Sequence, residues 1–345
     1  MKILAIKFKQ LGDVAIMVPA LRALREHWPE AEIHVLVEEA AVPILEHLPW
    51  IQKVWALPRK RGSARLKSTL PLIARLRRER FDRSVDFVGN DRGAIISLLI
   101  GARKRLGLRA PRGFAGRRFC YSETALEKTT NLVRCDLHTL EPWDVRPPSS
   151  LKHELHPDPT LRGFAENQLP DPDTILCHLS ASMPKREWPV AWWGEIAQRA
   201  QNAGLPLVFS SGPSDRDRAI LAELKALLPH ARFLEKTADL RGFLSILAHA
   251  GLFVGSDSGP FHFAVGLGTP AIGLFGPMLP ERVAPLEGNF RALLGRECTC
   301  CVHARVCTSA APCIQGVSVD RLWEEMMSLY QKGESGPCCS SFPLN

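Results

Sequence analysis

Two successive series of short apolar runs and amphipathic segments constrain the fold of this chain more than any other feature. The first half predicts strands at Ile3–Phe8, Ile33–Val37, Lys53–Leu57 and Ser84–Val88. Between them, apolar residues recur at helical spacing over 14–24, Pro43–Leu48 and Leu66–Arg80. Short buried strands that alternate with helices are typical of a parallel sheet covered by helices.

The same alternation begins again after a proline-dense stretch that has little periodicity. Strands are predicted at Thr174–Leu179, Leu205–Ser210, Ala231–Leu234, Leu252–Gly255 and Ala271–Phe275, and helices at Trp192–Ala203, Asp215–Leu228, Asp239–Ala250, Phe261–Gly266 and Val319–Tyr330. We therefore predict two Rossmann-like domains, at 1–150 and 173–332, with a linker at 151–172 and a disordered tail at 333–345. Two such sheets are expected to face one another across an interdomain cleft, with ligands at the carboxyl ends of their strands.

Composition limits the class of protein. Hydrophobic residues make up 46% of the 345 residues and charged residues 23%, which is an ordinary globular balance. The sequence contains no apolar run of the roughly 20 residues that a spanning helix needs, and its first residues do not resemble a signal peptide. We expect a cytoplasmic protein.

The formal net charge is +8, and the basic residues are concentrated in two segments. Nine basic residues and one acid lie between Arg59 and Arg80, and seven basic residues without an acid lie between Arg103 and Arg118. Such segments attract phosphates, acidic glycolipids, membrane surfaces or nucleic acid, or form a solvated face. No nucleic-acid module is recognisable in the sequence, which argues against a nucleic-acid partner.

The first candidate residue is Asp13, which follows the first predicted strand in the sequence QLGDV. Gly12 permits a tight turn and close approach of a ligand. Asp13 can serve as an N-cap of the next helix, or as a general base that removes a proton from a sugar hydroxyl. Local sequence leaves both roles open.

Two further loops combine polar groups suited to a diphosphate. HLSASMPKREWP, after the first strand of the second half, offers the hydroxyls of Ser180 and Ser182 and the cation of Lys185. An ordinary polar loop is the alternative. VGSDSGPFH then places Asp257, Ser258 and Gly259 before a helix that holds His262. The free N–H groups of a helix N-terminus bind phosphate readily, whereas a lone histidine there is often only a buried hydrogen-bonding residue.

Several common motifs are absent from the sequence. No GxGxxG follows the first strand, and no GxxxxGK[ST], GxSxG or HExxH occurs. No carboxylate cluster indicates an obligatory catalytic metal. The charge of a leaving diphosphate would then be offset by Lys185, Arg186 and the helix N-terminus.

From about Met1 to Tyr330, these three segments in this order resemble glycosyltransferase family 9, the ADP-heptose:lipopolysaccharide heptosyltransferases. The resemblance rests on MKILAIKFKQLGDVAIMVPALRAL, HLSASMPKREWP and VGSDSGPFHFAVGLGTPAIGLFGP. It implies a GT-B fold and an inverting transfer that requires no metal cofactor. It also implies that heptose moves from ADP-heptose to an anionic glycolipid of the lipopolysaccharide inner core, at the inner face of the inner membrane, where the enzyme would be peripheral.

By matching position, the resemblance implies that Asp13 is the catalytic base. It also implies that the donor contacts Ser180, Ser182, Lys185, Asp257, Ser258, Gly259 and His262. Glu187 departs from the family pattern, because it separates the basic pair from the WP dipeptide. A UDP- or GDP-sugar donor on the same architecture remains an alternative, and a non-catalytic glycan or nucleic-acid binder is a remote one.

Five of the ten cysteines lie between Cys298 and Cys313. Four thiolates, from Cys298, Cys301, Cys307 and Cys313, are suited to hold a structural zinc in tetrahedral geometry. The alternative is a set of reduced cysteines in a loop, as expected in a reducing compartment.

Overall fold

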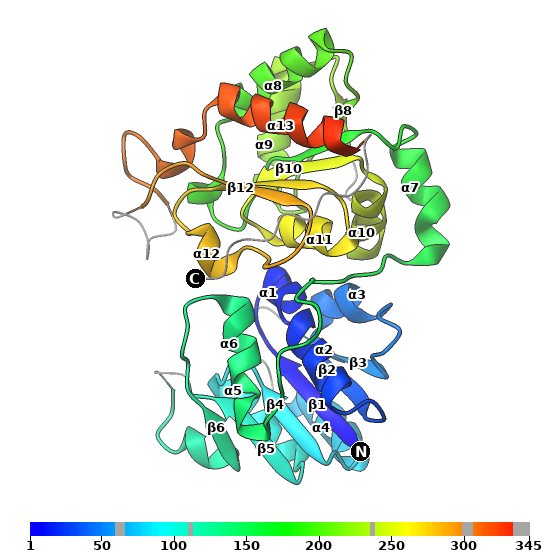
Figure 1. Cartoon of the computed structure of the whole chain (residues 1–345), viewed down its shortest axis with the longest axis vertical. Coiled ribbons are helices and arrows are strands. Elements are labelled where there is room, and N and C mark those ends of the chain that lie inside the picture. The colour runs from blue at the N-terminus through cyan, green and yellow to red at the C-terminus, as the bar shows by residue number, and fades with distance from the viewer. Residues whose placement is uncertain (59–65, 110–112, 235–238, 299–305, 334–345) are drawn as a thin grey trace. The chain divides into compact units, whose positions relative to one another are not determined.

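The computed structural model describes residues 1–58, 66–109, 113–234, 239–298 and 306–333. The chain divides into two compact units, Met1–His156 and Pro157–Asn345 (Figure 1). Each unit is an α/β structure with its own sheet and its own core.

Unit 1 is built on a six-stranded parallel sheet in the order β3-β2-β1-β4-β5-β6. Its strands are β1 (Lys2–Lys7), β2 (Glu32–Glu38), β3 (Lys53–Leu57), β4 (Arg83–Asp86), β5 (Lys104–Leu108) and β6 (Glu123–Ala125). Residues Ile3–Ile6 of the central strand are completely buried. A parallel strand covered on both faces requires such a continuous apolar run.

Helices complete unit 1. They are α1 (Leu11–Ile16), α2 (Val18–His27), α3 (Val42–Leu45), α4 (Leu66–Arg78), α5 (Asp91–Ile100) and α6 (Leu132–Thr139), with short 3₁₀ turns η1 (Glu39–Ala41), η2 (Arg117–Cys120) and η3 (Glu141–Trp143). One core cluster joins Leu4 and Ile6 of β1 to Ile73 and Leu76 of α4 and to Ile96 of α5. The apolar side of α4 therefore packs in the core, whereas Arg75, Arg77 and Arg78 of the same helix are exposed.

Unit 2 repeats the architecture, with a six-stranded sheet in the order β12-β11-β10-β7-β8-β9. Its strands are β7 (Ile175–His178), β8 (Leu207–Ser210), β9 (Arg232–Phe233), β10 (Leu252–Ser256), β11 (Ala271–Phe275) and β12 (Phe290–Leu294). Its helices are α7 (Arg162–Gln168), α8 (Val190–Asn202), α9 (Asp215–Leu227), α10 (Leu240–His249), α11 (Gly259–Leu267), α12 (Pro280–Val283) and α13 (Val319–Gly333), with 3₁₀ turns η4 (Pro159–Leu161), η5 (Pro184–Arg186) and η6 (Cys313–Gly316).

One core cluster of unit 2 lies between its sheet and the helices α8, α9 and α13. Trp188 and Trp193 are at most 2% exposed and pack edge to face, with ring centroids 5.0 Å apart. The same cluster contains Phe209 of β8 and Met326 of α13. The indole N–H of Trp188 donates to the Val317 carbonyl at 2.9 Å, so this buried ring leaves no donor unsatisfied.

Counted from the first strand of each unit, both sheets have the order 3-2-1-4-5-6, which is that of doubly wound nucleotide-binding folds. The order reverses between β1 and β4 in unit 1 and between β7 and β10 in unit 2. The predicted Rossmann-like α/β class is confirmed. Asp13, Ser180 and Asp257 each lie shortly after a strand at one of these switch points.

The predicted elements correspond to observed ones, with shifts of a few residues at their ends. The predicted helix over 14–24 is interrupted at Met17, where α1 ends and α2 begins. Helix α7 lies inside the segment predicted as a linker, and all but the first residue of the predicted tail lies outside the described residues. Within the described ranges, no helix is both long and apolar enough to cross a membrane.

Candidate functional site

Three loops meet at the carboxyl end of the unit 2 sheet, beside its switch point. The first, Leu179–Glu187, follows β7 and contains the predicted residues Ser180, Ser182 and Lys185. The second, Ser211–Ser214, follows β8, and the third, Asp257 and Ser258, joins β10 to α11. The sheet topology therefore brings together residues that are up to 80 positions apart in sequence.

The N-terminus of α11 presents unsatisfied polar groups. Ser258 is the N-cap residue, but its side chain makes no capping hydrogen bond. Within the described chain, the buried hydroxyls of Ser256 and Ser258 have no hydrogen-bond partner. Buried hydroxyls normally find one. Together with the free N–H groups and the dipole of α11, they form a site suited to an anion.

A cation is held at the same turn. The Arg186 guanidinium lies 3.1 Å from Asp257 Oδ2, and its Nη1 donates to the Asp257 carbonyl at 3.2 Å. Nε2 of His262 lies 3.9 Å from Asp257 Oδ1. The predicted residues Asp257 and His262 are thus neighbours, both buried, and Arg186 joins them to the loop after β7.

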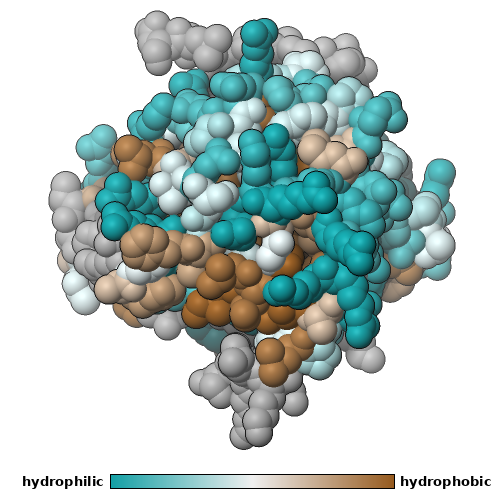
Figure 2. Space-filling view, turned by 90° about the horizontal axis from the view of Figure 1, so that it is seen from below, coloured by the Kyte–Doolittle hydropathy of each residue, from teal (hydrophilic) through white to brown (hydrophobic). Residues whose placement is uncertain are grey.

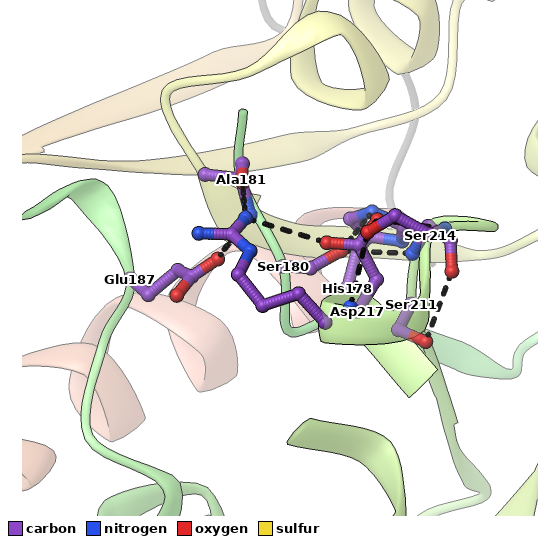
Figure 3. Close-up of polar contacts among 9 residues, drawn as sticks. His178, Ser180, Ala181, Glu187, Ser211, Ser214 and Asp217 are labelled. Atoms are coloured by element: carbon purple, nitrogen blue, oxygen red, sulfur yellow. Dashed lines mark hydrogen bonds and ion pairs between the residues drawn. The ribbon is translucent and has the colours of Figure 1, made fainter. Parts of the chain in front are cut away.

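His178 fixes the serine at the start of the first loop. Its Nδ1 shares a hydrogen bond with Ser210 Oγ at 2.9 Å, and its Nε2 lies 3.4 Å from Ser180 Oγ. The Gly212 N–H donates to Ser180 Oγ at 2.8 Å. Burial lowers the pKa of His178 to about 4, so the ring is neutral near pH 7. Figure 3 shows His178 and Ser180 close to one another in this network.

The remaining predicted residues of unit 2 lie close to this network in sequence and differ in exposure. Lys185 is buried and lies in the turn η5, whereas Ser182 is exposed to solvent on the same loop. Gly259 is the first residue of α11.

Asp13 lies in unit 1, near the carboxyl end of β1. Helix α1 begins at Leu11 with Gln10 as its N-cap residue, so the N-cap role for Asp13 is wrong. Asp13 is instead an acidic residue of the first turn, where the helix dipole favours a carboxylate. Its Oδ1 lies 3.7 Å from Lys9 Nζ, and its side chain is 18% exposed. The carboxylate is therefore partly exposed, and the Lys9 ammonium lies beside it.

A buried ion pair lies behind this turn. Lys7, the last residue of β1, contacts Asp136 of α6, and each side chain is 4% exposed. Burial raises the pKa of Asp136, and the Lys7 ammonium opposes that shift. The negative charge of Asp13 is close enough to raise the pKa of Asp136 further. The pair therefore fixes the carboxyl end of β1 against α6, shortly before the helix turn that contains Asp13.

Comparison with known proteins identifies the family. The family model described as "Glycosyltransferase family 9 (heptosyltransferase)" matches residues 69–310. The chain belongs to glycosyltransferase family 9. Lipopolysaccharide heptosyltransferase 1 of Pseudomonas aeruginosa is 26% identical over 98% of this chain and 93% of that protein. Lipopolysaccharide heptosyltransferase 3 of Escherichia coli is 25% identical over 77% of this chain and 80% of its own length.

The solved structure of the Escherichia coli ADP-heptose lipopolysaccharide heptosyltransferase II superimposes with a TM-score of 0.79 at 21% identity, covering 97% of this chain and all of that one. This likeness supports the predicted GT-B class for the family 9 chain. The chain is therefore a glycosyltransferase of the lipopolysaccharide heptosyltransferase family.

The predicted zinc site is only partly described. Cys301 lies outside the described residues, and Cys298, Cys307 and Cys313 lie inside them. Burial and the neighbouring Cys298 raise the pKa of Cys313 to about 11, which keeps it a thiol near neutral pH. No group of three or more potential ligands in the described ranges is arranged to hold a metal ion. Structural zinc stays a prediction.

Sequence reasoning missed three participants in the unit 2 site. His178 and Ser256 lay inside the two motif segments without a role of their own, and Ser210 was assigned only to a strand. A polar residue at the buried carboxyl end of an apolar strand is the signal that was available for each of them. Which loop each side chain contacts depends on strand order, which local sequence does not determine.

Proposed function

We propose that this enzyme is an inverting, metal-independent heptosyltransferase that moves heptose from ADP-heptose to an anionic acceptor of the lipopolysaccharide inner core. The observation that carries the proposal is the pair of unpartnered buried hydroxyls, Ser256 and Ser258, at the N-terminus of α11. Membership of family 9 and the names of the relatives supply the substrate class.

In the proposed donor site, the diphosphate accepts hydrogen bonds from Ser258 and from the first N–H groups of α11, beginning at Gly259. Lys185 and Arg186 add positive charge, and Ser180 and Ser182 add hydroxyl donors. These groups offset the charge that develops on the leaving nucleoside diphosphate, because fixed donors in a partly dry site stabilise that charge more than water does. Asp257 and His262 hold the turn and Arg186 in place.

In the proposed transfer step, Asp13 takes the proton of the acceptor hydroxyl. The hydroxyl oxygen forms the new bond to the anomeric carbon as the bond from that carbon to the diphosphate oxygen breaks. The electron pair leaves with ADP, and a single displacement inverts the configuration. General base catalysis contributes about 10²–10⁴-fold to the rate, and positioning supplies more.

The test is transfer from ADP-heptose to a truncated lipopolysaccharide core acceptor. We expect Asp13→Ala to lower transfer by about 10²-fold or more while ADP affinity is retained. Asp91→Ala is the matched control, because Asp91 is a first-turn acid of α5 in the same unit. Near-normal turnover in Asp13→Ala would remove Asp13 from this role. Tight binding of UDP or GDP instead of ADP would leave the proposed reaction type unchanged but would replace ADP-heptose with a UDP- or GDP-sugar as the donor.

We also propose that unit 1 meets an anionic membrane surface through α5 and η2, as a peripheral protein on the cytoplasmic face. Ile95 and Leu98, one turn apart on α5, are 40% and 45% exposed, and Phe119 of η2 is 70% exposed. Helix α5 packs against η2. Arg118, next to Phe119, places its guanidinium over that ring at 4.7 Å. Figure 2 shows hydrophobic side chains gathered on one part of the face it presents, beside hydrophilic ones.

Exposed aromatic and aliphatic side chains beside arginines suit the interface of an anionic bilayer. We expect the protein to float with vesicles that contain phosphatidylglycerol at low salt, and Phe119→Ser with Leu98→Ser to reduce the bound fraction. Leu227→Ser in unit 2, which is 57% exposed, serves as the control. Equal binding by the patch variant and the control would exclude α5 and η2 as the contact surface.

A further inference from the structure

Glu187, the residue that departs from the family pattern, closes the loop that carries Lys185. Its Oε1 accepts a hydrogen bond from the Ala181 N–H at 3.0 Å. One carboxylate therefore joins both ends of the segment 181–187. Helix α8 begins at Val190, so the far end of this loop is also anchored.

The same carboxylate oxygen contacts the helix that follows the neighbouring loop. Nη2 of Arg216, in the first turn of α9, lies 2.9 Å from Glu187 Oε1 and also donates to the Ala181 carbonyl. Asp217 Oδ1 lies 3.4 Å from the same nitrogen. Figure 3 shows Glu187 and Ala181 on one side of this network and Asp217 and Ser214 on the other. The Glu187–Arg216 pair thus connects the loop that follows β7 to the start of α9, directly after the loop that follows β8.

The pair is partly sheltered from solvent. The Glu187 side chain is 15% exposed and that of Arg216 is 38% exposed. Burial raises the pKa of Glu187, while the Ala181 N–H and the Arg216 charge act in the opposite direction. The rest of the network is anchored as well, because Ser214 and Asp217 form a capping box at the start of α9. Arg216 therefore extends from a fixed helix end rather than from a mobile segment.

We infer that Glu187 is a positioning residue which, with Arg216, holds segment 181–187 in its binding conformation before the donor arrives. The inference rests on the proposed donor site, because that segment carries Lys185 and Arg186. Its other side is attached to the α11 turn through Arg186 and Asp257, 3.1 Å apart. A loop ordered in advance loses less conformational entropy when a ligand binds. Loss of the pair should therefore weaken donor binding more than it slows turnover at saturating donor.

The test compares Glu187→Ala, Glu187→Gln, Arg216→Ala and the double variant in the full chain. The first readout is hydrogen exchange of the backbone amides of the non-proline residues between 180 and 188 without ligand, and the second is the affinity for ADP. We expect both alanine variants to accelerate exchange and to weaken ADP binding by about 10-fold, which is the loss of one charge-assisted hydrogen bond. Glu187→Gln retains an acceptor for the Ala181 N–H. Its exchange rate and its ADP affinity should therefore lie between those of the alanine variants and those of the wild type.

The double variant should bind ADP no more weakly than the weaker single variant, because the two residues act as one unit. Arg199→Ala is the control. It removes an ion pair of 2.6 Å with Asp320 in the same unit that involves neither loop. In the Glu187 and Arg216 variants, a raised KM for the donor with a nearly unchanged kcat at saturating donor would support a positioning role for Glu187.

Unchanged exchange in Glu187→Ala would overturn the inference, as would faster exchange with unchanged ADP affinity. A wild-type protein that bound no ADP would refute the donor assignment instead, while the exchange comparison would still decide whether the pair orders the loop.

Discussion

The buried Lys7–Asp136 pair permits a quantitative test of unit 1. Asp136→Asn keeps the shape of the side chain and leaves the Lys7 ammonium buried without its counter-charge, in a position where both side chains are 4% exposed. At contact distance and an effective dielectric constant of about 20, the lost attraction is about 5 kcal/mol. A stranded amine can also lose its proton, and neutralising an ordinary lysine at pH 7 costs about 5 kcal/mol. We therefore expect a loss of about 3–5 kcal/mol in the free energy of unfolding.

The loss should depend on pH in a defined direction. The unfolded chain of the Asp136→Asn variant keeps a lysine proton that the folded chain tends to release. The free energy of unfolding of this variant therefore rises with pH. We expect the penalty at pH 9 to be smaller than at pH 7 by about 1–2 kcal/mol. Replacing both partners, as Lys7→Met with Asp136→Leu, should restore most of the stability, because an apolar pair is then buried in place of two charges.

Urea-dependent hydrogen exchange of the β1 amides measures the stability of unit 1 in the full chain. The exposed Lys128–Glu141 pair of the same unit is the matched control, since its side chains are 56% and 43% exposed. Glu141→Gln should change the free energy by less than about 1 kcal/mol. A penalty below about 1 kcal/mol for Asp136→Asn, or one that does not change with pH, would refute the reasoning for a desolvated pair.

Three other expectations concern single positions. Burial lowers the pKa of His178 to about 4, so the unfolded chain binds a proton at this residue more readily than the folded chain. The free energy of unfolding of the wild type should therefore fall by about 2 kcal/mol from pH 7 to pH 5 because of this residue. Urea unfolding of His178→Asn should show a flatter pH dependence. A Cβ at Gly107 would lie 2.4 Å from ring carbons of Tyr121, so Gly107→Ala should lose about 1–3 kcal/mol in the same assay, and a neutral result would show that the ring can move. Ser258→Ala should leave stability within about 0.5 kcal/mol, yet weaken ADP binding in calorimetry by about 10-fold; unchanged affinity would remove that hydroxyl from the donor site.

The sequence by itself determined the elements whose local pattern is unambiguous. The predicted strands Lys53–Leu57 and Ala271–Phe275 coincide with β3 and β11. Each is a short apolar segment bounded by turn residues, and such a segment has few alternatives in an α/β chain. The three motif segments also indicated the family, because they consist of contiguous residues.

Elements without a distinctive period were not predicted. Helix α5 has apolar residues on several sides, since Ile96 and Ile100 are buried while Ile95 and Leu98 are exposed. Strand β6 has only three residues, and β12 follows a glycine-containing loop. Local propensity is a weak guide in such segments, because tertiary packing decides their conformation.

Only the tertiary structure decided which polar residues meet. Lys7 and Asp136 are 129 positions apart, and Glu187 and Arg216 are 29 apart. Each pair exists because the fold places two particular elements side by side. The free energy of such a contact depends on burial and distance, and neither quantity is encoded in the residues next to it in sequence.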